Sequence, residues 1–266
     1  MSRIESVFDE NAESYDSQFS FTWLGNYYRQ RTQRVFAAYI PQQASVLELN
    51  SGSGEDAVYL VKSGHQVLAT DISSRMLACV DKKTSANRLE NRLTTRQLDI
   101  ANLNQLSGQK FDVILSNFGG LNCIKHWSKF AQDARHLLNE QGRMILCLMG
   151  PKVPWEWLWF GVRGEFSKAF RRVSGHCEWK GANIYYPSLN EFTAVMQEAN
   201  FEQLHAEALG VLMPPSYVNA HVSRHQKVYI KIARLEERIA NSKLACRLAD
   251  HYLLVLQKQS EFVGRQ

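Results

Sequence analysis

Short apolar runs alternate with helix-compatible stretches through the first half of the chain, the pattern of a parallel β-sheet whose strands are joined by helices. Because crossovers between parallel strands are right-handed, helices would cover both faces of such a sheet. The fold class expected is therefore α/β, with a doubly wound and mostly parallel sheet. The expected strands are Ser45–Leu49, Gln66–Thr70, Leu93–Leu98, Phe111–Ser116 and Arg143–Met149.

The pattern changes after Met149, because residues 150–186 are rich in Trp, Phe, Arg and Gly and show no clear strand period. The alternation then resumes, and Pro214-Pro215 interrupts it once. The later elements expected are a helix over Leu189–Glu198, a strand over Phe201–Ala208, a helical stretch over Val218–Arg247 and a strand over His251–Gln257. We expect one domain, residues 1–266, divided into an N-terminal helical cover (1–40), a cofactor-binding core (41–150) and two cap or lid excursions (151–187 and 212–249).

Composition narrows the class of protein without naming a partner. The 266 residues are 45% hydrophobic and 21% charged, which is typical of a globular domain. A net charge of +5 permits an acidic partner but does not require one. The five cysteines form no CxxC pair, so neither a disulfide framework nor a zinc site is expected. With a polar, acidic N-terminus and no bilayer-length apolar run, the chain is expected to be soluble and cytoplasmic.

The most informative segment runs from Val46 to Ala57, where an apolar strand enters a turn containing Gly52 and Gly54 and then a helix. Glycine lets the backbone approach a ligand closely, and Asn50 tolerates a left-handed conformation. The same spacing fits a dinucleotide fingerprint. A turn that binds nothing is a further alternative.

The charges around this turn favour a cationic ligand. A pyrophosphate would lie against the helix start, yet Glu48, Glu55 and Asp56 surround that position. Three carboxylates repel phosphates but are compatible with a ligand that carries an ammonium and a sulfonium. The turn is therefore predicted to bind S-adenosylmethionine.

Two aspartates follow the next strands and extend this hypothesis. Asp71 ends the second strand at a spacing that suits a carboxylate accepting both ribose hydroxyls; capping the helix that contains Met76 is the alternative. Asp99 can accept the adenine amino group while Ile100 packs on the ring, or it can be a solvated loop residue.

Together these residues resemble the class I S-adenosylmethionine-dependent methyltransferases, most closely the ubiquinone/menaquinone-biosynthesis type and related small-molecule enzymes. The resemblance covers residues 7–149, and a weaker resemblance extends to Gln257. It implies a Rossmann-like sheet of seven strands, the last antiparallel. Asn50 departs from the family pattern, in which glycine is usual. The cofactor residues expected are Tyr15, Glu48, Asn50, Gly52, Gly54, Asp71, Ile72, Met76, Asp99, Ile100, Asn117 and Phe118.

No catalytic motif is evident, because in-line methyl transfer depends mainly on orientation. The Asn-Pro-Pro-aromatic motif of many nucleic-acid and protein N-methyltransferases is absent, which favours an oxygen or carbon nucleophile. His126 and His221 are the candidate general bases, although a single histidine is more often a surface residue than a base. His221 and His225 have the spacing of a metal pair, but no third ligand is evident, so no metal is expected.

Trp155, Trp157 and Trp159, followed by several arginines, form an aromatic cluster after the fifth strand. We expect an apolar lid over a lipophilic or aromatic substrate. A peripheral membrane-surface helix and a buried packing element are the alternatives. Nucleic acid is not expected as a partner, because basicity is moderate and no RNA-binding module is visible. The expected activity is methylation of a small molecule; an RNA or protein methyltransferase and a non-catalytic cofactor-binding protein remain the alternatives.

Overall fold

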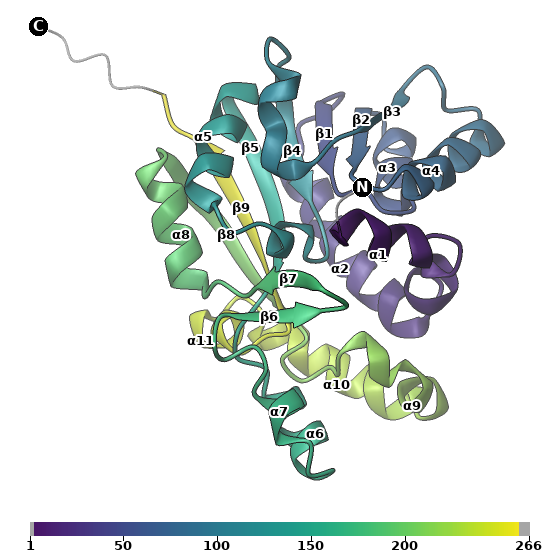
Figure 1. The fold of residues 1–266 in the computed structure, drawn as a ribbon, viewed down its shortest axis with the longest axis vertical. Coiled ribbons are helices and arrows are strands. Elements are labelled where there is room, and N and C mark those ends of the chain that lie inside the picture. Colours follow the sequence, from purple (N-terminus) through teal and green to yellow (C-terminus); the bar gives the residue numbers. More distant parts are fainter. Residues whose placement is uncertain (1–2, 261–266) are drawn as a thin grey trace, which may run out of the picture.

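The computed structural model describes residues 3–260, in which a seven-stranded sheet lies between two layers of helices (Figure 1). The strand order is β3-β2-β1-β4-β5-β9-β8. β1 to β5 pair in parallel, and β9 is antiparallel to both β5 and β8. The expected sheet, with its last strand antiparallel, is confirmed. The sheet strands are β1 Ser45–Leu49, β2 Gln66–Asp71, β3 Leu93–Gln97, β4 Phe111–Ser116, β5 Leu138–Met149, β8 Phe201–Leu209 and β9 His251–Lys258.

Helices cover both faces of the sheet, and each layer buries its own apolar cluster. The helices that contribute to one cluster are α2 Trp23–Tyr39, α3 Glu55–Lys62, α4 Ser74–Asn87, α9 Asn219–Arg224 and α10 Gln226–Ile239. Those that contribute to the other are η2 Ile100–Leu106, η3 Gly120–Cys123, α5 Trp127–Leu137, α8 Leu189–Glu198 and α11 Lys243–Arg247. The central strands are buried on both faces, which explains why they read as nearly continuous apolar runs.

The remaining elements lie at the carboxyl ends of the parallel strands or project from the body. Those of the N-terminal part are α1 Arg3–Asn11 and η1 Asp16–Ser20. Those of the later part are α6 Pro154–Gly161, α7 Phe166–Ala169, the hairpin strands β6 His176–Trp179 and β7 Ala182–Tyr185, and η4 Ser216–Val218. Figure 1 shows the hairpin in front of the sheet, with α6 and α7 extending below it.

The hairpin is an addition to the expected elements, because residues 150–186 show no clear strand period in the sequence and yet contain β6 and β7. β6 and β7 pair around Lys180 and Gly181, which both have positive φ angles (51° and 83°). This is the backbone of a two-residue turn that matches strand twist. A correction concerns β5, which begins at Leu138, directly after α5, and not at Arg143. The irregular pairing between Phe111 and Val113 accommodates the extra residues.

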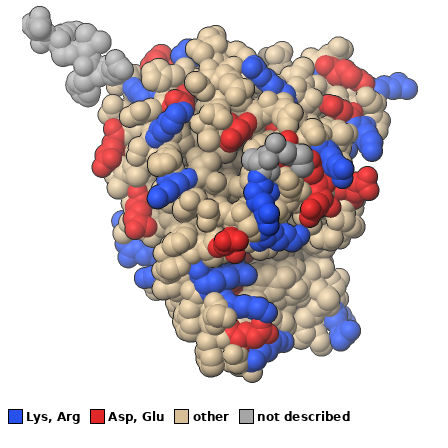
Figure 2. Space-filling model, in the orientation of Figure 1, with Lys and Arg blue, Asp and Glu red and all other residues tan. Residues whose placement is uncertain are grey.

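No helix within residues 3–260 is long and apolar enough to cross a bilayer. Figure 2 shows Lys and Arg interspersed with Asp and Glu over the face of Figure 1. On this face there is no extended surface of a single charge sign of the kind that binds a nucleic-acid backbone.

Candidate functional site

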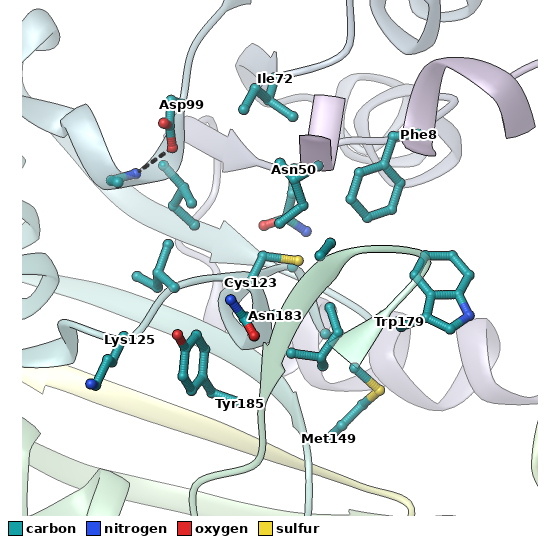
Figure 3. Close-up of a pocket in the computed structure, with 18 of the residues that line it drawn as sticks. Phe8, Asn50, Ile72, Asp99, Cys123, Lys125, Met149, Trp179, Asn183 and Tyr185 are labelled. Atoms are coloured by element: carbon teal, nitrogen blue, oxygen red, sulfur yellow. Dashed lines mark hydrogen bonds between the residues drawn. The ribbon is translucent and has the colours of Figure 1, made fainter. Parts of the chain in front are cut away.

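A cavity of about 930 Å³ lies at the carboxyl ends of β1, β2 and β4, where open α/β sheets bind ligands. α1 and Tyr15 close it on one side, and the β6–β7 hairpin closes it on another. Figure 3 shows Asn50, Ile72 and Asp99 at one end, Tyr185 and Lys125 at the other, and Asn183 with Cys123 between them. The volume lies within the range of pockets that hold drug-sized ligands.

Ten of the twelve residues expected to bind a cofactor line this cavity. They are Tyr15, Asn50, Gly52, Asp71, Ile72, Met76, Asp99, Ile100, Asn117 and Phe118. The other two are Glu48, which lines a smaller adjoining pocket, and Gly54, which lines neither. A Cβ on Gly54 would lie 2.9 Å from Val80 Cγ2, so this glycine serves close packing of α3 against α4.

The aspartate that ends β2 holds the glycine turn in place. The Asp71 carboxylate accepts the Gly52 N–H through Oδ2 and the Ser73 N–H through Oδ1, both at 2.9 Å. Burial raises the pKa of Asp71 to about 6, although the backbone hydrogen bonds act in the opposite direction. The cap of α4 is Ser73, which accepts the Met76 N–H, so the capping alternative for Asp71 is wrong.

Asn50 adopts the left-handed conformation that the sequence suggested, with φ of 49°. Its Nδ2 donates to the Asn117 carbonyl at 3.1 Å, and its Oδ1 accepts from Ser116 Oγ at 2.7 Å. A Cβ on Gly120 would lie only 1.8 Å from Asn50 Cγ. The asparagine that replaces the usual glycine therefore ties the β1 turn to the β4 loop, and Gly120 leaves room for it.

The charges around the turn are more balanced than the sequence alone indicated. Arg29 Nη1 lies 2.6 Å from Asp56 Oδ2, and Lys83 Nζ lies 2.6 Å from Glu55 Oε1. Only Glu48 lacks a cationic partner at ion-pair distance, and its Oε2 has no hydrogen-bond partner within the described residues. Burial, together with nearby Asp56, holds the pKa of Glu48 well above its usual range.

Arg29 is the functional candidate that sequence reasoning missed. Glu48 and Arg29 line the same small pocket beside Asn50 and Gly52. Arg29 is buried, and its Nε has no partner within the described residues. It comes from α2, outside every motif, so only its spatial position next to the turn reveals it.

The other end of the cavity is built from the η3–α5 loop and the hairpin. Cys123, Ile124, Lys125 and His126 line it from the loop. The hairpin contributes every residue from Cys177 to Tyr186 except Lys180. The only local signal for this hairpin was Gly181 at the second turn position, and it is weak because Lys-Gly is not among the dipeptides that favour such turns.

The aromatic cluster is not part of the cavity. Trp155, Trp157 and Trp159 lie on α6 and line no part of it, whereas Trp179 of the hairpin does. Trp155 Nε1 instead donates to the Leu212 carbonyl at 2.6 Å. These three tryptophans are therefore withdrawn as substrate contacts.

The two candidate bases have different positions. His126 lines the cavity, immediately before α5. His221 lies on α9 outside the cavity, with its ring centroid 4.7 Å from that of His225, and is withdrawn as a base. Within residues 3–260 no group of three or more metal-ligating side chains comes together.

Comparison with known proteins supports the cofactor class that the turn suggested. A methyltransferase-domain model matches residues 46–142. A demethylmenaquinone methyltransferase of Lactiplantibacillus plantarum is 22% identical over 213 residues, covering 76% of this chain and 89% of that protein.

Solved structures share the fold at low identity. The 1,6-didemethyltoxoflavin-N1-methyltransferase of Burkholderia thailandensis, with bound S-adenosylhomocysteine, has a TM-score of 0.62 at 14% identity, covering 97% of this chain and 88% of its own. The [4+2]-cyclase SpnF has a TM-score of 0.65 at 12% identity, covering 96% and 94%. Because a cyclase shares the fold, the domain match and the sequence relatives carry the identification. The chain is a class I S-adenosylmethionine-dependent methyltransferase related to the quinone-biosynthesis type, with S-adenosylmethionine as its cofactor.

Proposed function

We propose that this enzyme methylates an oxygen or carbon atom of a small lipophilic or aromatic acceptor, which binds in the hairpin end of the cavity. The observation that carries the proposal is one continuous space reaching from the Gly52 turn to Tyr185 and Tyr186. Its volume of about 930 Å³ is enough for a nucleoside cofactor and a small second molecule together. The demethylmenaquinone relative favours an aromatic, quinone-like acceptor.

The nucleoside half of the cofactor would bind between β2 and η2. A carboxylate has about four lone-pair sites, and the two backbone hydrogen bonds of Asp71 leave capacity for ribose hydroxyls. Asp99 accepts the Ala101 N–H at 2.9 Å through Oδ1 and the Asn102 Nδ2 at 3.5 Å through Oδ2, and the second lone pair of Oδ2 would accept from an adenine amino group. Ile72, Met76 and Ile100 would pack on the apolar faces of the nucleoside.

The amino-acid half would bind at the smaller pocket. Glu48 offers a carboxylate without a cationic partner for an ammonium group, and Arg29 offers a guanidinium for a carboxylate. An unpaired buried carboxylate is costly unless a ligand supplies the missing positive charge, so the residues present fit this group.

Bound S-adenosylmethionine supplies the methyl group as an electrophilic sulfonium. The contribution of the chain is to hold and orient the reactants and to exclude water. Tyr15 and Phe118 line both pockets and would screen their junction from solvent. Burial raises the pKa of Tyr15 to about 12, so its hydroxyl is neutral and does not act as a base near pH 7. His126 is the remaining candidate base for an acceptor that must lose a proton.

The single-domain organisation proposed from the sequence, with its N-terminal cover and cap excursions, is retained. The cavity draws residues from the N-terminal segment, the core and the first excursion, which supports treating residues 1–266 as one functional unit. A cytoplasmic location belongs to the same proposal, whereas peripheral membrane contact is independent of it. An RNA or protein substrate is disfavoured because α1 and the hairpin line two sides of the cavity and narrow the access to it.

The test separates the two ends of the cavity. Tyr185→Ala should raise the KM for a soluble quinol or phenol acceptor by about tenfold, while the Kd for S-adenosylhomocysteine stays within about twofold. Trp157→Ala, an aromatic-to-alanine change outside the cavity, is the control and should alter neither constant. Binding of S-adenosylhomocysteine with no transfer to any small acceptor would indicate a non-catalytic protein. Equal losses of acceptor and cofactor affinity in Tyr185→Ala would refute the assignment of the hairpin.

A further inference from the structure

The α6–α7 segment carries a concentration of exposed apolar side chains beside the cavity. Of the thirteen large hydrophobic residues exposed within residues 3–260, five fall in residues 158–173. They are Leu158, Val162, Phe166, Phe170 and Val173, with exposed fractions of 50–74%. We call these five residues the α6–α7 patch. Such a cluster on a soluble domain marks an interaction surface.

The patch is held outward by buried contacts on the opposite side of α6. Glu156 is 1% exposed and lies 2.8 Å from Arg172 Nη2. At 3.6 residues per turn, Leu158 and Val162 lie about 200° and 240° around the helix from Glu156. Trp157 stacks on Phe170 with ring centroids 5.9 Å apart, which joins α6 to α7. The apolar face is therefore presented to solvent by a fixed scaffold.

The charges that border the patch are mainly positive. Lys152, Arg163 and Lys168 are exposed, whereas Glu165 is half-buried and paired with Lys168. The Arg163 guanidinium lies 3.6 Å from the centre of the Trp159 ring. Figure 2 shows Lys and Arg among tan surface, with some acidic groups, at the lower end where Figure 1 places α6 and α7. Apolar and aromatic side chains bordered by basic ones match an anionic lipid interface.

We propose that the α6–α7 patch docks the enzyme on the surface of an anionic phospholipid bilayer. The patch adjoins the cavity along the chain, because Phe170 is followed directly by Arg171 and Arg172, which line it. Docking would place the acceptor end of the cavity close to the lipid, from which a lipophilic acceptor can enter. This last step rests on the proposed function; the docking itself does not.

The test measures binding of the full chain to vesicles by sedimentation. Vesicles of phosphatidylglycerol and phosphatidylcholine should bind the protein, and phosphatidylcholine alone should bind it at least tenfold more weakly. Raising the salt concentration should weaken binding to the anionic vesicles, since salt screens the basic border. Leu158→Gln combined with Phe166→Gln should reduce binding at least tenfold. Leu244→Gln is the matched control, because Leu244 is equally exposed (66%) but lies on α11, and it should bind as the unmodified protein does.

Two further measurements keep the proposals separable. S-adenosylhomocysteine affinity and methylation of a soluble acceptor should be unchanged in the double variant. Vesicle binding without methyl transfer would leave the docking surface standing and refute the proposed function. Absence of binding to anionic vesicles, with cofactor affinity intact, would overturn the docking proposal alone. A dimer in sedimentation velocity that the double variant dissociates, without vesicle binding, would assign the patch to a second copy and also overturn it.

Discussion

Replacing Asp71 by asparagine tests whether this buried carboxylate binds the cofactor or only holds the glycine turn. The aspartate accepts hydrogen bonds from the Gly52 and Ser73 N–H groups. Asparagine keeps the size but has one acceptor oxygen, so it cannot satisfy both backbone donors and also receive ribose hydroxyls. The affinity for S-adenosylhomocysteine should fall by about 1–3 kcal/mol, or roughly 5- to 150-fold.

The raised pKa of Asp71 also predicts how the affinity for S-adenosylhomocysteine depends on pH. Burial raises the pKa of Asp71 from 3.8 to about 6, which corresponds to about 3 kcal/mol for ionising the group in the fold. The stability that comes with the bound proton is present below pH 3.8 and is lost as pH rises through about 6. Ribose hydroxyls donate to the ionised form, so ligand affinity should change in the opposite direction. If S-adenosylhomocysteine binds only when Asp71 is ionised, its Kd at pH 5 should be about ten times its Kd at pH 7.

Titration calorimetry of S-adenosylhomocysteine at several pH values distinguishes these effects. The unmodified protein should lose affinity for S-adenosylhomocysteine below pH 6. In Asp71→Asn, the part of this loss that comes from protonation of Asp71 should be missing. Any slope left in the variant belongs to other groups, chiefly Glu48, whose pKa is also raised. For the apo protein, removal of a buried charge and loss of one backbone hydrogen bond oppose each other, so Tm should change little. Equal affinity and parallel pH profiles in both proteins would refute cofactor binding by Asp71.

Two predictions concern the framework around the site. Glu236 is fully buried and accepts the N–H groups of residues 210–213 at 2.7–3.0 Å, so Glu236→Gln should destabilise the fold by about 3 kcal/mol or more in thermal or urea unfolding. The exposed neighbour Glu237→Gln should cost less than ~1 kcal/mol, and similar losses in both would contradict this reasoning. Gly120→Ala should weaken S-adenosylhomocysteine binding at least tenfold, because its Cβ would overlap Asn50. Asn50→Gly in the same chain should restore most of the affinity, and an additive double variant would show that the two positions are not coupled.

Local sequence was enough to predict the sheet and most of the residues that line the cavity around the Gly52 turn. Apolar runs bounded by polar segments located the central strands, since burial on both faces leaves a strong signal. The edge strands β3 and β8 are only partly buried, and the alternation of strands with helices located them. Asn50 and Gly52 stand in a short turn whose conformation depends on the residues themselves. Asp71 ends β2 and Asp99 follows β3, and parallel strands bring their carboxyl ends to one edge of the sheet whatever the rest of the chain does.

The hairpin end of the cavity was decided by tertiary structure alone. Trp155, Trp157 and Trp159 look like substrate contacts in sequence, but helical rotation and packing against Leu212 direct α6 away from the cavity. The weak β-pattern of residues 176–185 becomes a cavity wall only because the hairpin lies across the sheet edge.

The charges around the Gly52 turn were likewise determined partly by the sequence and partly by the fold. The sequence by itself determined that three carboxylates surround the turn, because all three lie within nine residues of one another. Only the fold decided that Arg29 and Lys83, distant along the chain, pair with Asp56 and Glu55 and leave Glu48 without a cation. Short-range order is a property of neighbouring residues, whereas the net charge a ligand meets is a sum over every group that folding brings within a few ångströms.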